Sequence, residues 1–87
     1  MEDYYFNGYL LDVNYFTLES PDIKLLEACH WLVDNNATIR TTGLNFDIPK
    51  TSLHRYIHNG RLRKLSYELY CCTVRVLKKH LRNGGFK

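Results

Sequence analysis

The sequence predicts an all-α fold, a small helical bundle preceded by an N-terminal aromatic arm or hairpin. Apolar residues recur at helical spacing in several segments, and glycine, proline or asparagine separates these segments from one another. The chain has 87 residues, of which 45% are hydrophobic, enough to bury one modest core. We therefore expect an acidic, aromatic arm over residues 1–19 and one helical domain over residues 20–87.

The arm is rich in tyrosine and phenylalanine. Residues 6–9 read Phe-Asn-Gly-Tyr, which places a turn-forming Asn-Gly pair between two short aromatic runs and predicts a hairpin. An isolated hairpin is only marginally stable in water. We therefore expect the arm to lay its rings on the helical body or on a partner chain.

The first helix is predicted to begin at residues 20–22, which read Ser-Pro-Asp. Serine caps free N–H groups, proline tolerates the first turn, and aspartate suits the positive end of the helix dipole. Helical spacing then relates a set of apolar residues that we expect to face the core: Ile23, Leu26, Cys29 or His30, and Val33. The run Asp-Asn-Asn at residues 34–36 ends this helix.

A second, shorter helix is predicted after the capping residue Thr38, with an inner face formed by Ile39, Thr42, Gly43 and Phe46. Gly43 is costly inside a helix, but its missing side chain allows another helix to approach closely. Residues 46–49, Phe-Asp-Ile-Pro, predict a tight turn, because aspartate tolerates a left-handed backbone. Ile48 can enter the core and Pro49 can open the next helix.

The third helix is predicted over residues 49–58 and stops at the Asn-Gly pair that follows. Leu53 and Ile57, four residues apart, point inward. The outer face then carries the side chains that suit contact with base edges in a DNA major groove: Lys50, Thr51, Ser52, His54 and Arg55. Two helices joined in this way predict a helix-turn-helix, with the third helix as its recognition helix.

A basic connector over residues 61–65, Arg-Leu-Arg-Lys-Leu, leads into the last predicted helix, residues 66–82. Its expected buried stripe consists of Tyr70, Val74, Leu77 and Leu81, broadened by Leu69, Thr73 and Val76. A second stripe on another side is basic: Arg75, Lys78, Lys79 and Arg82. We expect this C-terminal basic helix to contact phosphates.

The two halves of the chain differ in charge. Residues 1–36 hold seven acidic residues and one basic residue, whereas residues 37–87 hold eleven basic and two acidic residues. The second half should therefore attract a polyanion. The predicted contacts to a DNA backbone are Arg40, His58, Arg61, Arg63, Lys64, Arg75, Lys78, Lys79 and Arg82.

Residues 36–40 read Asn-Ala-Thr-Ile-Arg, residues 46–55 read Phe-Asp-Ile-Pro-Lys-Thr-Ser-Leu-His-Arg, and residues 79–85 read Lys-His-Leu-Arg-Asn-Gly-Gly. These stretches resemble the helix-turn-helix and the C-terminal end of the stage III sporulation protein D family. The resemblance covers roughly residues 25–85. It implies a two-part grip on DNA, with the recognition helix on the bases and the basic helix on the backbone or an adjacent minor groove.

The resemblance further implies a bacterial, cytoplasmic and nucleoid-associated regulator of sporulation transcription, with double-stranded DNA and RNA polymerase as partners. A regulator or recognition domain from a phage or mobile element would carry the same module. We expect a monomer or weak homodimer without a cofactor. We expect no membrane contact, since no run approaches about 18 uncharged apolar residues.

Metal binding and catalysis have less support. His54 and His58 stand four residues apart with Cys71 and Cys72 downstream, but no Cys-x-x-Cys pair accompanies them, and we expect no metal site. Adjacent cysteines also suit an ordinary disulfide poorly, so we expect reduced thiols.

No recognisable nucleophile, base and orienting group occur together, and we do not expect an enzyme. The main rival hypothesis is a protein-interaction module that assembles through the Tyr-rich arm and Trp31, with no duplex bound.

Overall fold

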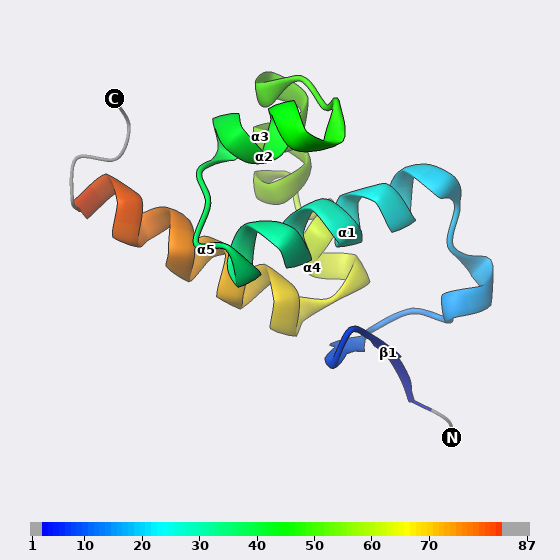
Figure 1. Ribbon diagram of the computed structural model, residues 1–87. Helices are drawn as coiled ribbons and strands as arrows, with labels where there is room; N and C mark the ends of the chain where they lie inside the picture. The colour runs from blue at the N-terminus through cyan, green and yellow to red at the C-terminus, as the bar shows by residue number, and fades with distance from the viewer. Residues whose placement is uncertain (1–2, 83–87) are drawn as a thin grey trace.

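Helices make up most of the part of the chain that the computed structural model describes, which is residues 3–82, with side chains to residue 80 (Figure 1). In chain order the elements are β1 (Tyr4–Phe6), β2 (Tyr9–Leu11), the 3-10 helix η1 (Tyr15–Thr17), α1 (Ser20–Asp34), α2 (Ile39–Phe46), α3 (Lys50–His58), α4 (Arg61–Leu65) and α5 (Tyr67–Arg82). The predicted small helical domain with an N-terminal hairpin is confirmed. Within the described residues, no helix is both long and apolar enough to cross a membrane.

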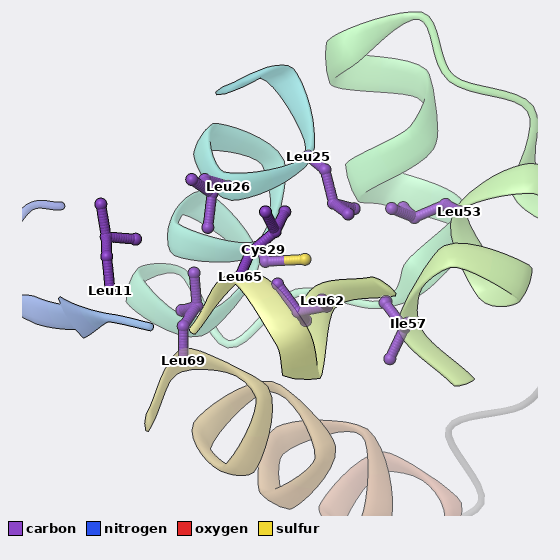
Figure 2. Packing of buried hydrophobic residues seen from close by; sticks show 9 residues of the cluster. All are labelled: Leu11, Leu25, Leu26, Cys29, Leu53, Ile57, Leu62, Leu65 and Leu69. Atoms are coloured by element: carbon purple, nitrogen blue, oxygen red, sulfur yellow. The ribbon is translucent and has the colours of Figure 1, made fainter. Parts of the chain in front are cut away.

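One core holds the elements together (Figure 2). It draws side chains from β2, α1, α3, α4 and α5: Leu11, Leu25, Leu26, Cys29, Leu53, Ile57, Leu62, Leu65 and Leu69. Burying each leucine side chain stabilises the fold by roughly 1.5–3 kcal/mol. Burial also raises the pKa of the Cys29 thiol to about 12, so this thiol stays protonated in the core at neutral pH.

The hairpin has the two-residue turn that its sequence predicts. Asn7 and Gly8 both have positive φ, at 48° and 89°, which the hairpin turn of type I′ requires. The turn pairs Phe6 with Tyr9, and both rings meet the imidazole of His30 on α1 edge to face, with ring centroids 6.3 and 6.0 Å away. The arm therefore lays its rings on the helical body, one of the two expected outcomes.

Hydrogen bonds fasten the same arm to the junction of α4 and α5. The Asp12 N–H donates to the Leu65 carbonyl at 2.8 Å, and the Ser66 hydroxyl donates to the Leu10 carbonyl at 2.7 Å. The carboxylate of Asp12 accepts from the Tyr67 N–H at the start of α5, also at 2.8 Å. The hairpin is thus bonded to residues more than fifty positions away, and it forms part of the body.

The junction of α2 and α3 is a close backbone contact. Thr38 caps α2 by accepting from the Thr41 N–H at 3.2 Å, as predicted. At the other end, Asp47 takes the left-handed conformation, with φ 56° and ψ 43°, and the Ile48 N–H donates to the Gly43 carbonyl at 2.8 Å. A Cβ atom on Gly43 would lie 2.5 Å from the Ile48 carbonyl oxygen. The missing side chain therefore lets the chain fold back across α2 before α3 begins.

Two predictions about α1 are wrong in detail. The helix begins at Ser20 as predicted, but Glu19 and not Ser20 occupies the capping position, and the Glu19 N–H donates to the Asp22 carboxylate at 3.4 Å. Its buried face also differs from the predicted one and consists of Leu25, Leu26, Ala28, Cys29 and Leu32, whereas Ile23 and Val33 are half-buried. Because α2, α5 and the hairpin cover α1 from different sides, its buried face is wider than a single stripe.

The predicted connector over residues 61–65 is a helix, α4. Asn59 and Gly60 start it: the Asn59 side chain accepts from the Arg61 N–H at 2.9 Å, and Gly60 has φ 96°. Helical spacing then turns Leu62 and Leu65 into the core. These two contacts are long-range, which is why the local basic composition did not indicate a helix.

In α5 the inward face lies to one side of the predicted stripe. Leu69 and Thr73 are fully buried, whereas Tyr70, Val74 and Leu77 are half-buried. The Thr73 hydroxyl donates to the Leu69 carbonyl at 2.8 Å, which satisfies it inside the core. The side chain of Leu81, also assigned to the stripe, lies outside the described residues.

We predict that Gly43→Ala destabilises the fold by about 1–3 kcal/mol, because the new methyl group would overlap the Ile48 carbonyl oxygen and force the turn to shift. Urea unfolding followed by circular dichroism measures this change. Asn45→Ala is the control, since Asn45 is exposed on the same helix and should change stability by less than about 0.5 kcal/mol. Equal stability of the two variants would contradict the close contact.

Candidate nucleic-acid interface

The outer face of α3 is polar and open to solvent. Leu53 and Ile57 anchor the helix in the core, each with no exposed surface. Of the five residues predicted to face bases, Ser52 is half-buried. The other four are exposed: Lys50, Thr51, His54 and Arg55. The helix therefore presents hydrogen-bond donors of different lengths on one side and is fixed by apolar contacts on the other.

Ser52 is less exposed because it lies beside the first turns of α1. It lines a shallow hollow together with Pro21, Lys24, Pro49 and other residues of α1 and α3. Lys24 is exposed there and adds a cation at the edge of the outer face of α3. Charge counting along the chain missed Lys24, because it stands alone among acidic residues and only the packing of α1 beside α3 gives it this position.

A second hollow joins α2 to the beginning of α3. Arg40 and Lys50 both line it, and both are exposed. Asp47 lines it as well and supplies a nearby acidic group. Arg40 and Lys50 are ten positions apart in the sequence, and the left-handed turn brings them to one side of the molecule.

His54 and His58 form a close pair one helical turn apart on α3. Their ring centroids are 4.4 Å apart and the ring planes are tilted by 43°. Partial burial of its ring, and then repulsion from a protonated His54, lower the pKa of His58 below its ordinary value of 6.5. His58, predicted as a contact to the DNA backbone, is therefore mainly neutral at pH 7 and offers hydrogen-bonding atoms in place of a charge.

The basic residues of α4 differ in how free they are. Arg61 pairs with Asp22 at the start of α1, and its guanidinium lies 5.7 Å from the centre of the Tyr56 ring. This ion pair joins α1 to α4, and it engages the Arg61 guanidinium, which was predicted to contact phosphate. Arg63 and Lys64 are exposed, with the Arg63 guanidinium 5.4 Å from the centre of the Tyr67 ring.

The basic stripe of α5 is also exposed. Arg75, Lys78 and Lys79 lie on the side away from the buried face, while the Arg82 side chain lies outside the described residues. His80 donates from Nε2 to the Asn36 carbonyl at 2.8 Å, which holds the last turns of α5 beside the loop between α1 and α2. Elsewhere α5 lies on the opposite side of α1 from α2 and α3 (Figure 1).

The exposed face of α3 and the cations at its edge, Lys24 and Arg40, make up what we call the α3 surface. No protein-family model, no curated protein and no solved structure matches this chain. Within residues 3–82, no three side chains of His, Cys, Asp or Glu gather in an arrangement that could hold a metal ion.

We predict that the His58 imidazole titrates below pH 6.5 and that His54→Gln raises its pKa only part of the way back, because burial is the larger cause. An NMR titration of the imidazole protons measures both values. Since the unfolded chain binds this proton more readily, acidification through this range should slightly destabilise the fold. Thr51→Ala leaves both rings in place and should not move the pKa of His58; an unchanged value in His54→Gln would refute the pairing.

Proposed function

We propose that this chain is a sequence-specific double-stranded DNA-binding protein that reads a major groove with α3. The observation that carries the proposal is the two-sided character of that helix. Leu53 and Ile57 fix it to the core, while Lys50, Thr51 and Arg55 stand free on its outer face. A major groove admits one α-helix, and side chains of these types are the ones that reach base edges from it.

We further propose that α2, the turn at Asp47 and α3 form a helix-turn-helix. Three local features support this. Gly43 allows close backbone approach, Asp47 supplies the left-handed turn, and Ile48 packs against the core directly after it. In such a motif the second helix projects from the surface of the protein, so that its outer side can enter a DNA groove.

Within this proposal the residues have different roles. Arg55 suits the acceptor edge of guanine, and Lys50 suits guanine or a phosphate. Thr51 and Ser52 suit the backbone or a thymine methyl group. Arg40 and Lys24 border the helix and suit the flanking phosphates. Arg61 is left out of this set, because Asp22 already pairs with it.

The C-terminal helix would supply the second part of the grip, as in regulators of the stage III sporulation protein D family. The bond between His80 and Asn36 supports this, since it keeps the last turns of α5 next to the loop that leads from α1 into α2. Lys78 and Lys79 lie in those turns and are exposed. Arg75, one turn earlier, lies farther from α2 along the helix and is a weaker candidate for the same duplex.

One observation favours a second candidate function, a protein-interaction module. Phe16 is 82% exposed and Tyr5 is 59% exposed, and the ring of Phe16 meets those of Tyr4 and Tyr15 edge to face. Exposed aromatic rings gathered in one place are typical of contact surfaces between proteins. We therefore keep the hairpin as a candidate surface for self-association or for a partner protein.

We predict that binding to duplex DNA weakens steeply with salt. Four phosphate contacts would lower the affinity about 100-fold between 50 and 200 mM salt, because binding releases counterions from the DNA and this release becomes less favourable as the salt concentration rises. Fluorescence anisotropy on a random duplex and on a duplex selected in vitro measures this slope. A flat response, or no binding to either duplex, favours the aromatic interaction module.

We predict that Arg55→Ala and Lys79→Ala fail in different ways. Arg55→Ala removes a base contact and should reduce the preference for the selected duplex about tenfold. Lys79→Ala removes a phosphate contact, so it should weaken binding to all duplexes alike and lower the salt slope by about one. Phe16→Ser is the control, since Phe16 lies on η1, outside the α3 surface. Equal losses on every sequence for both variants would contradict the assigned roles.

A further inference from the structure

Two neighbouring imidazole rings lie on the outer face of α3. His54 and His58 are both exposed, and their ring centroids are 4.4 Å apart. They are four residues apart, so one helical turn separates them on the same face. Neither ring makes a hydrogen bond within the part of the chain that the structure describes, which leaves their outer nitrogens available to a ligand.

Neutral imidazole is a good ligand for borderline divalent transition-metal cations such as Cu²⁺, Ni²⁺ and Zn²⁺. Each metal–nitrogen bond measures about 2.0–2.1 Å, so two imidazoles on one cation have ring centres roughly 5 Å apart. The observed 4.4 Å is close to that separation, and a small rotation of two exposed side chains covers the difference. The same i, i+4 spacing places the two histidines of helical zinc sites on one cation.

The surroundings of the pair leave further positions of a bound cation open. Cys71 and Cys72 belong to α5, and within the described residues they do not gather with the two histidines into a group of three or more possible ligands. With no third protein ligand among the described residues, the cation would keep positions for water or for an external ligand.

We propose that His54 and His58 form a two-imidazole binding site for a borderline divalent transition-metal cation on the outer face of α3. The site does not depend on the proposed function. One consequence does rest on it: a bound cation would occupy the two imidazoles and the space in front of them, and would compete with a duplex for the α3 surface.

Isothermal titration of the untagged full chain with NiCl₂ at pH 7.5 tests the site. The matched variant combines Thr51→His with His54→Thr, which keeps the composition and the exposure but separates the two imidazoles by about 10 Å along the helix. We expect the wild-type chain to bind Ni²⁺ at least about tenfold more tightly than this variant, because the second imidazole adds to the first on one cation. His30 and His80 contribute the same background to both proteins.

Wild-type affinity no tighter than that of the swapped variant would overturn the site. His58→Gln provides a second check, since it should lose the tight phase as well, and NMR line broadening by Ni²⁺ should then no longer centre on α3. If either variant fails to fold, the other still decides the outcome.

The consequence for DNA is measured separately, as the change in duplex affinity on adding saturating Ni²⁺ to each protein. We expect a several-fold loss for the wild-type chain and little change for the swapped variant. Tight Ni²⁺ binding without DNA binding would support the site and count against the proposed function, whereas DNA binding without tight Ni²⁺ binding would do the reverse.

Discussion

The close approach between Gly43 and the carbonyl of Ile48 is the contact on which the exposed surface depends. Any larger residue would push the chain away from α2 at the point where it turns. The left-handed Asp47 completes the reversal, and the Ile48 N–H returns to the Gly43 carbonyl. Together the close contact, the left-handed residue and the hydrogen bond hold α3 against α2, and Leu53 and Ile57 then turn one side of α3 into the core and leave the other side to solvent.

Features determined by neighbouring residues could be predicted from the sequence. The Asn-Gly turn of the hairpin, the Thr38 cap and the turn at Asp47 each depend on a few adjacent residues, and each is present. The inner face of α3 was also predictable, because one pair, Leu53 and Ile57, fixes its rotation. These are positions where local backbone preference and burial favour the same structure.

Features determined by distant contacts could not be predicted in this way. The five residues of α4 are too few to be helical by propensity alone, and they become a helix because Leu62 and Leu65 meet α1 and α5 in the core. The buried faces of α1 and α5 depend on which elements cover them. The same reason accounts for the composition of the α3 surface, which Lys24 joins only because α1 packs beside α3. Arg61 was predicted to contact phosphate, but it pairs with Asp22, which lies 39 positions away in the sequence.

The distribution of charge on the α3 surface separates two tasks under the proposed function. The cations that stand at its borders, Lys24 and Arg40, are long and flexible and suit phosphates, which supply affinity without reading sequence. The outer face of α3 also holds the His54–His58 pair, in which His58 is mainly neutral at pH 7. A neutral imidazole offers directional hydrogen bonds and no charge, so attraction to the polyanion would come from the cations at the borders, and selectivity from the side chains predicted to face bases, Arg55 among them.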